Sequence, residues 1–303
     1  MDKNQYLIIG GSTKCGTTSV FKYFEFHPEV CPCVLKESRF FLESEYLFQK
    51  TRKQRDFKNA QHFSDLFPDC KPGSLRLEAT PDYLYSEKAA LRIKSELPEV
   101  KFIFILRNPV ERLKSWYKFA ITMGLMDAGI SFERYIREQE QSSATAHQHM
   151  KSLDQGRYAP HIEQNFALFR KDSIHVCFYE DLVKDPNKFC SGIAQFAGID
   201  PSYFNNYDFK IYNKTVQVKS VGVHNIFRKF KRTIRPLTRM LPIASRKRLK
   251  LAGYNLEQAY FTANKKGIDE KIVVTPELKN FIEEYYASDS SQLRQLTGKE
   301  LPW

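Results

Sequence analysis

Residues 10–19, Gly-Gly-Ser-Thr-Lys-Cys-Gly-Thr-Thr-Ser, are the most informative stretch of this chain. They follow an apolar run at 6–9 and precede a segment of helical character at 17–26. A strand, a glycine-rich turn and a helix in this order cradle phosphate on backbone N–H groups at the helix N-terminus. The stretch therefore predicts a phosphate-binding loop.

The spacing of this loop differs from that of nucleoside triphosphatases in one position. Gly11 and Gly16 enclose four residues, as in the motif G-x-x-x-x-G-K-[ST]. Thr17 stands where that motif has its lysine, and the lysine of this chain is Lys14. A nucleoside triphosphatase needs the motif's lysine on the β- and γ-phosphates. We expect Lys14 to act instead at the 5′ end of a nucleotide.

Length and composition predict a globular protein with a sizeable core. The chain has 303 residues, 42% hydrophobic and 14% aromatic, and no run of 18 apolar residues that predicts a transmembrane helix. The short polar segment 1–5 leaves no room for a signal peptide and predicts a cytoplasmic protein. A Golgi-type luminal domain is the alternative if a targeting segment has been lost. The six cysteines predict buried or idle thiols.

Positive charge is concentrated in one segment. Residues 228–250 hold ten Lys or Arg and no Asp or Glu, and so account for ten of the twelve net positive charges. Apolar residues alternate with these cations at roughly helical spacing. The pattern suits a helix on an anionic membrane surface, peripheral to the membrane, or a lid over an anionic acceptor. A solvated basic surface is the alternative, and no motif for nucleic-acid binding accompanies the segment.

Apolar strands alternate with helices along the chain. Continuous apolar strands in this arrangement predict an α/β fold, with a central parallel β-sheet flanked by helices in a single domain over 1–303. The expected strands are 6–9, 75–78, 101–107 and 174–179. The expected helices are 17–26, 87–97, 109–123, 132–140, 159–170, 186–197 and 276–296.

A second motif falls at the end of the strand expected at 101–107. Arg107 ends that strand, Asn108 is a plausible helix N-cap and Pro109 a plausible first helical residue. Ser115 follows two turns into the helix. Ligands of such sheets bind outside the carboxyl ends of the strands, and a guanidinium with a hydroxyl suits a phosphate there. The alternative is that Arg107 pairs with a surface carboxylate.

With both motifs in place, the chain resembles the sulfotransferases that use 3′-phosphoadenosine 5′-phosphosulfate (PAPS), most closely the heparan-sulfate-type and bacterial carbohydrate enzymes. Arg107 and Ser115, in Leu-Arg-Asn-Pro-x5-Ser, are similar to the family's 3′-phosphate motif. Residues 27–28 and 36–41, then 156–158, 179–186 and 285–303, fit the family too, so the resemblance spans nearly the whole chain. The residues similar to the family's 5′-phosphosulfate loop are Lys14, Cys15, Gly16, Thr17, Thr18 and Ser19.

This resemblance implies in-line transfer of a sulfuryl group from PAPS to a hydroxyl or amine of an acceptor, such as a carbohydrate or glycolipid. It implies that Glu37 is the general base, that Lys14 stabilises the charge on the bridging oxygen, and that Lys36 positions the transferred group. No metal is expected, since lysines and backbone N–H groups can stabilise spread-out negative charge. His27 is interpreted as structural, with a role as base held in reserve.

One departure bears on the acceptor. Heparan-type enzymes often carry Glu-Lys before a Thr-Pro-x-Tyr stretch, whereas this chain reads Glu78-Ala79 before Thr80-Pro81-Asp82-Tyr83. Ala79 in the lysine's place argues against a polyanionic, heparan-like acceptor, and Glu78 can still act near the acceptor.

Two other classes of function stay open at this point. A P-loop nucleotide kinase fits the glycine spacing, although Thr17 replaces the lysine and Arg107, not an aspartate, ends the best strand. A basic protein that binds membranes or other polyanions fits residues 228–250. Preference for adenosine 3′,5′-bisphosphate over ATP would favour the sulfotransferase.

Overall fold

The computed structural model describes residues 5–43, 62–97, 99–122, 125–127, 129–140, 151–210, 272 and 274–303, with the isolated residues 256 and 260. The basic segment 228–250 and the two histidines at 147 and 149 lie outside the described residues. The chain divides into two compact units, and the first comprises 1–116, 131–213 and 274–303. The second comprises 117–130 and 214–273. The sheet belongs to the first unit, and the single domain over 1–303 stays a prediction.

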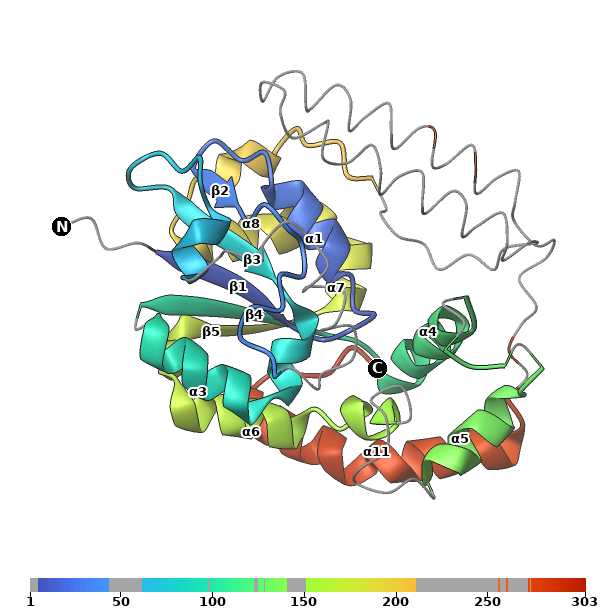
Figure 1. Ribbon diagram of the computed structural model, residues 1–303. Coiled ribbons are helices and arrows are strands. Elements are labelled where there is room, and N and C mark those ends of the chain that lie inside the picture. Colours follow the sequence, from blue (N-terminus) through green and yellow to red (C-terminus); the bar gives the residue numbers. More distant parts are fainter. Residues whose placement is uncertain are drawn as a thin grey trace. The chain divides into compact units, whose positions relative to one another are not determined.

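Five parallel strands form the central sheet (Figure 1). They run in the order β2-β3-β1-β4-β5, so β1 pairs with β3 on one side and with β4 on the other. The predicted fold class is confirmed. The strands are β1 (Tyr6–Gly11), β2 (Val30–Pro32), β3 (Leu75–Ala79), β4 (Val100–Leu106) and β5 (Ile174–Phe178).

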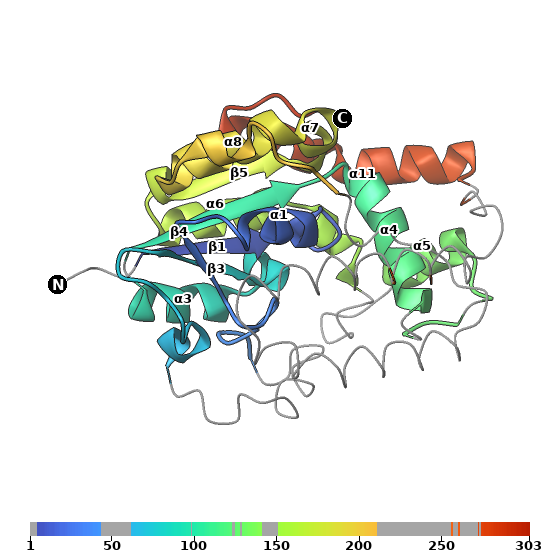
Figure 2. The same ribbon diagram turned by 90° about the horizontal axis from the view of Figure 1, so that it is seen from above.

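Both faces of the sheet are covered. Successive strand residues point to opposite faces, and on each face they are buried. In β4, Phe102 and Phe104 belong to one buried cluster, whereas Ile103 and Ile105 belong to the other. Figures 1 and 2 show helices on both faces. Residues of α3 (Glu87–Glu96), α6 (Ala159–Leu168) and α11 (Pro276–Thr297) enter the first cluster. Residues of α1 (Thr17–Phe24), α7 (Tyr179–Lys184) and α8 (Pro186–Ala197) enter the second.

Local sequence sets the ends of the helices. Ser86 and Asp185 accept hydrogen bonds from the backbone N–H groups of Ala89 and Lys188, which caps the first turns of α3 and α8. Gly198 ends α8 with a left-handed φ of 83°, a conformation that glycine adopts without steric cost. The other α-helices in the described part of the chain are α4 (Pro109–Thr122) and α5 (Phe132–Glu140).

Every strand and helix expected from the sequence occurs, with ends that differ by at most two residues. The sequence missed β2, which has only three residues. It also missed α7, which begins directly where β5 ends and whose first residue, Tyr179, was assigned to the strand. Neither element is long enough to show a periodic pattern of its own. No helix among the described residues is long and apolar enough to cross a membrane.

The expectation of idle thiols is wrong for two of the six cysteines. Cys31 in β2 and Cys70 form a disulfide across a sequence separation of 39. Spacing alone gave no signal, because the fold brings β2 beside the segment that follows η1 (Phe63–Leu66). The free cysteines are all buried, as expected: Cys15, Cys33, Cys177 and Cys190.

Loss of the disulfide should destabilise the protein. We expect Cys70→Ala to lower the free energy of unfolding by about 2–4 kcal/mol, because a closed loop of this length restricts the unfolded chain. Urea unfolding with and without a thiol reductant measures the effect. The reductant should destabilise the wild type and leave Cys70→Ala unchanged. Equal sensitivity of the two proteins would show that the bond does not form in solution.

Candidate functional site

The predicted phosphate loop follows β1, the strand at which the strand order of the sheet reverses. From β1 the chain leads to β2 and β3 on one side and then to β4 and β5 on the other, and ligands bind at such a point. The Ser12 backbone N–H donates to the Ile105 carbonyl at 2.7 Å, which ties the loop to β4. The Ser12 hydroxyl also shares a hydrogen bond with the Tyr85 hydroxyl. The loop is therefore held from two sides.

Gly16 shapes the turn from this loop into α1. It is the residue before the helix and has a left-handed φ of 82°. A Cβ atom at this position would lie 2.9 Å from the Tyr179 ring. A side chain would therefore be both strained and obstructed, so glycine is needed here. The first backbone N–H groups of an α-helix lack the acceptors one turn earlier that later residues have, which makes the start of α1 suited to an anion.

Lys14 lies in the loop under unusual constraint. Its φ is 68°, a left-handed value that costs energy for a residue with a side chain. Burial lowers the pKa of Lys14 to about 8; Glu37 opposes this shift, and Arg107 and Lys36 add to it. The lysine is thus a desolvated cation among other cations. An anion bound among these cations would offset both the burial of the Lys14 charge and its repulsion by Arg107 and Lys36.

Lys36 and Glu37 lie in a turn after β2 that is also left-handed. Glu37 has a φ of 60° and Arg39 a φ of 54°. The Lys36 Nζ and a Glu37 carboxylate oxygen are 2.7 Å apart, and Arg39 approaches the second oxygen at 2.7 Å. Such backbone conformations persist only where surrounding contacts determine them, and they cluster at functional sites.

The ion pairs control the charge of Glu37. Burial works to raise the pKa of Glu37, but Lys36, Arg39 and Lys14 outweigh it and lower that pKa to about 2. Glu37 is therefore ionised, and a cation occupies each of its oxygens. The shared interaction with Lys14 also places this turn beside the phosphate loop.

Arg107 is the first residue after β4 and reaches across to the loop. Its Nη1 donates to the Lys14 carbonyl at 3.2 Å, and its guanidinium lies 4.5 Å from the centre of the Tyr179 ring. No carboxylate in the described part of the chain forms an ion pair with Arg107, so the alternative of a surface ion pair is not observed there. Asn108 caps α4 as expected, since its Oδ1 accepts from two backbone N–H groups.

Buried contacts fix the backbone around Arg107. The Tyr158 hydroxyl donates to the Arg107 carbonyl at 2.9 Å, and the Asp289 carboxylate accepts the Tyr158 backbone N–H at 3.0 Å. Glu180 accepts the Asn108 backbone N–H at 2.9 Å. Segments 156–158, 179–186 and 285–303, which the sequence could only match by resemblance, thus position Arg107.

The structure brings together Lys14, Lys36, Glu37 and Arg107 of the predicted site residues. Cys15 is buried beneath the loop, where burial raises the pKa of its thiol to about 11. Thr17, Thr18 and Ser19 form the first turn of α1, and Ser115 lies further along α4. Sequence reasoning missed Arg39, which stands between motif residues in the 36–41 stretch and had no signal of its own.

His27 has a structural role in this fold. It is buried, its Nε2 lies 2.9 Å from the Asp200 carbonyl, and its Nδ1 accepts the Glu29 backbone N–H at 3.2 Å. Both ring nitrogens are therefore engaged by backbone groups. Within the described residues no group of three or more His, Cys, Asp or Glu side chains is arranged to hold a metal ion.

Comparisons with known proteins agree with this geometry. The profile of the sulfotransferase domain family matches residues 4–289. Mouse bifunctional heparan sulfate N-deacetylase/N-sulfotransferase 4 is 27% identical over 213 residues, which cover 66% of this chain and 23% of that protein. The human enzyme 3 of the same name is 26% identical over 213 residues, with 66% and 23% covered. The chain therefore spans less than a quarter of the length of these relatives.

A solved structure shows the same fold. The crystal structure of a sulfotransferase from Alicyclobacillus acidocaldarius aligns with 97% of this chain and 96% of its own, with a TM-score of 0.67 and 18% identity. At that identity the likeness concerns the fold alone. It agrees with the parallel sheet and the helices on both of its faces.

The burial of Lys14, with Arg107 and Lys36 nearby, predicts that this lysine destabilises the free protein. Its pKa of about 8 lies below the ordinary 10.5, so the folded state binds fewer protons between these values and stability rises with pH across that window. At lower pH the whole cost is present. Lys14→Met should therefore raise the free energy of unfolding near pH 7 by on the order of 1 kcal/mol. The gain is this small because solvent reaches part of the Lys14 side chain and screens its charge. The gain should shrink as the pH rises.

Urea unfolding at several pH values measures this effect. Lys188→Met is the control, because Lys188 is an exposed residue of α8. A destabilised Lys14→Met protein would show that the ion pairs around Lys14 outweigh its burial.

Proposed function

The chain belongs to the sulfotransferase family, and from this premise we propose that it transfers a sulfuryl group from PAPS to a hydroxyl or amine of a carbohydrate or related acceptor. The observation that carries the proposal is the convergence of Lys14, Lys36 and Arg107 on the phosphate loop, with Glu37 among them. Cations in a partly desolvated site suit a reaction whose transition state carries spread-out negative charge.

The residues present fit the nucleotide donor. The left-handed Gly16, where a side chain would meet Tyr179, turns the loop into α1, and the N–H groups at the start of that helix suit a 5′-phosphate group. Arg107 follows β4 and Ser115 lies on the next helix, where the 3′-phosphate would be bound. When bound, the donor supplies an activated sulfuryl group on a good leaving phosphate. The chain's own work is to position that group and to manage charge and protons.

Each charged residue has a role in this proposal. Glu37 accepts the proton of the attacking hydroxyl or amine. Lys14 neutralises the charge that grows on the phosphate oxygen as its bond to sulfur breaks. Lys36 orients the sulfonate oxygens while the new bond to sulfur forms on the opposite side. Glu37 can act as a base only if Lys36 turns from its carboxylate to the sulfonate, because the present pairs hold its pKa at about 2.

We propose a carbohydrate acceptor because the similar mammalian enzymes are named for heparan sulfate. Ala79, in place of a lysine, favours an acceptor with less negative charge. A transfer screen with ³⁵S-labelled PAPS over N-desulfated heparin, neutral glycans and glycolipids tests this assignment.

The Cys31–Cys70 disulfide supports maturation in an oxidising compartment rather than the cytoplasm.

Replacement of Lys14 should stop transfer without unfolding the protein. We expect Lys14→Ala to lower kcat by about 10²–10³-fold, because a fixed cation at a developing oxyanion contributes a few kcal/mol. Initial rates of ³⁵S transfer measure the effect, with Lys188→Ala as the control. A variant that keeps more than half of the wild-type kcat would exclude Lys14 from the reaction.

Replacement of Glu37 should separate turnover from nucleotide binding. Glu37→Gln should remove turnover without weakening the binding of adenosine 3′,5′-bisphosphate, because a general base acts on the acceptor. Isothermal titration calorimetry reports the affinity, and Glu111→Gln, an exposed glutamate of α4, is the control. Loss of nucleotide affinity together with activity would assign Glu37 to the nucleotide or to the fold.

Replacement of Arg107 should affect one phosphate of the nucleotide. Arg107→Ala should weaken binding of adenosine 3′,5′-bisphosphate by about 10–100-fold and binding of adenosine 5′-phosphate much less, since a charge-assisted bond contributes about 1.5–3 kcal/mol. Ser115→Ala should show the same selectivity to a smaller degree. Arg134→Ala, in an exposed ion pair of α5, is the control. Equal losses for both nucleotides would argue against a 3′-phosphate site.

A further inference from the structure

Glu78 is a buried carboxyl group near the site that the proposed reaction does not use. It is 0% exposed and lies one residue before the end of β3. Glu78 pairs with Ile8 of the parallel strand β1, so the carboxyl ends of the two strands lie side by side. The phosphate loop follows β1 at that end of the sheet. Glu78 therefore lies on the side of the sheet where the charged residues gather.

One carboxyl oxygen of Glu78 holds the turn that carries Glu37. Glu78 Oε1 accepts from the Ser38 backbone N–H at 3.0 Å and from the Ser38 hydroxyl at 3.0 Å. It also accepts from the Thr80 hydroxyl at 2.6 Å. The Thr80 hydroxyl in turn accepts the Arg39 backbone N–H at 3.1 Å. Glu78 thus anchors Ser38, the residue between Glu37 and Arg39, directly, and anchors Arg39 through Thr80.

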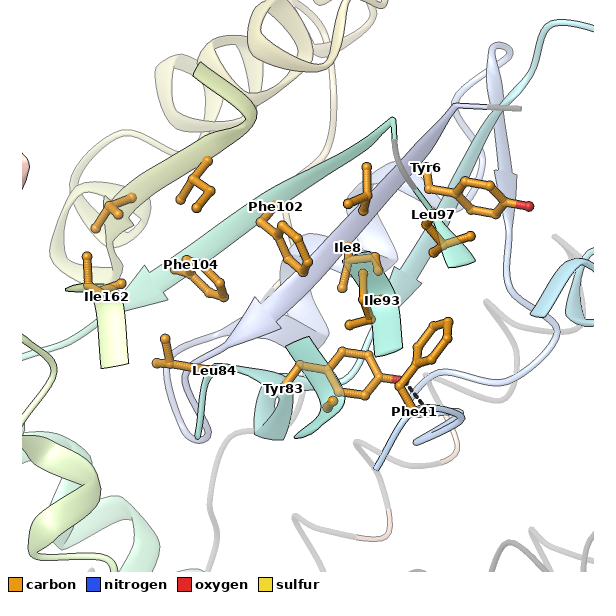
Figure 3. Packing of buried hydrophobic residues seen from close by; sticks show 14 of the residues in the cluster. Tyr6, Ile8, Phe41, Tyr83, Leu84, Ile93, Leu97, Phe102, Phe104 and Ile162 are labelled. Carbon is orange, nitrogen blue, oxygen red and sulfur yellow. Dashed lines mark hydrogen bonds between the residues drawn. The ribbon is translucent and has the colours of Figure 1, made fainter. Parts of the chain in front are cut away.

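Two further hydrogen bonds fasten the same turn. The Glu37 backbone N–H donates to the Ala79 carbonyl at 2.8 Å. The Phe41 backbone N–H donates to the Tyr83 hydroxyl at 3.3 Å, drawn as the dashed line in Figure 3. Because Glu37 and Arg39 both hold left-handed backbone conformations, the turn needs such external bonds to keep its shape.

The second oxygen of Glu78 is the atom that the turn leaves over. Oε2 is buried and has no hydrogen-bond partner among the described residues. Burial raises the pKa of Glu78 to about 7, against the bonds from Thr80 and Ser38 and the attraction of Lys36. A buried oxygen without a donor is the favoured place for the proton of a neutral acid.

The groups that face Glu78 are known from each neighbouring segment. The turn contributes Lys36, and η2 (Pro81–Tyr85) contributes Tyr83. The paired residue of β1 is the apolar Ile8. If Glu78 lost its proton, its charge would attract Lys36 and compete with the sulfonate for it. The neutral form therefore suits the reaction better.

We propose that Glu78 is a positioning residue for Glu37: as a neutral acid protonated on Oε2, it holds the 36–41 turn in the reacting geometry through Oε1. This role rests on the proposed function of Glu37 as the base. It adds to that function a buried acid which neither touches the donor nor takes the acceptor's proton.

Two substitutions separate the hydrogen bonds of Glu78 from its charge. Glu78→Gln keeps an oxygen that accepts three bonds and cannot ionise, whereas Glu78→Leu removes the acceptor. Glu29→Leu is the control. The Glu29 carboxylate also accepts a backbone N–H, that of Asp200 at 2.7 Å, but Glu29 precedes β2 and so lies at the amino end of the strands, away from the phosphate loop. Turnover of ³⁵S-labelled PAPS is measured with a neutral glycan and with water as acceptor.

We expect Glu78→Leu to lose about 100-fold in kcat, with the affinity for adenosine 3′,5′-bisphosphate changed by less than about threefold. Glu78→Gln should keep wild-type turnover below neutral pH, and it should lose the decline that the wild type shows as pH rises through about 7. Glu29→Leu should keep both the turnover and the decline.

Thermal unfolding gives a second readout that needs no acceptor. Because the pKa of Glu78 is raised from 4.5 to about 7, the stability that it contributes is present below the lower value and lost as pH rises through the higher one. The Tm of Glu78→Gln should therefore gain on that of the wild type between about pH 5 and pH 8. This comparison decides the charge state even if Glu78→Leu does not fold.

Three results would overturn the role of Glu78. The first is full turnover by Glu78→Leu. The second is a Glu78→Gln variant that is as slow as Glu78→Leu at every pH. The third is a Glu78→Gln variant whose turnover follows the wild-type pH profile and whose Tm differs from that of the wild type by the same amount at every pH. Glu37→Gln is assayed in parallel. Normal turnover by that variant would overturn the proposed base itself, whereas an inactive Glu37→Gln beside an active Glu78→Leu would overturn only the role of Glu78.

Discussion

The burial of a cluster of cations around the phosphate loop dominates the energetics of this site. Burial is the main cause that lowers the pKa of Lys14 to about 8, and the nearby charges of Arg107 and Lys36 lower it further. Glu37 is the nearby carboxylate that offsets part of this charge. A fold that holds such a cluster together has to fix its members by backbone contacts, since their side chains alone would separate.

The backbone contacts come from every layer of the first unit. Ser12 is tied to β4, and Arg107 reaches back to the Lys14 carbonyl, so hydrogen bonds fasten the loop to the end of β4 in both directions. Tyr158 then fixes Arg107, and Asp289 of α11 fixes Tyr158. Residues far from the loop in sequence thus serve it. This explains why a resemblance over nearly the whole chain accompanies a site built from a few short segments.

The sequence predicted the sheet and its helices well because their patterns are long and local. Strands such as Val100–Leu106 are continuous apolar runs, and Asn108 with Pro109 marks the start of α4. It failed where the determining contact is distant or the element short. The Cys31–Cys70 bond spans 39 positions, and β2 has three residues. The pairing of Arg39 with Glu37 depends on two left-handed residues, a conformation that glycine would have signalled but that Glu and Arg do not.

The same ion pairs that keep the free site stable also restrain its proposed chemistry. A carboxylate with a pKa of about 2 takes up a proton poorly, so Glu37 is a weak base while Lys36 and Arg39 hold it. An anion bound in the loop competes for Lys36, and each cation that leaves Glu37 raises its pKa toward the value that burial alone would set. The charge that the donor brings would therefore make the base stronger at the moment when a proton has to be accepted. Binding order and basicity are linked through one lysine, and the turn beneath it, fastened to Glu78, keeps that lysine within reach of both partners.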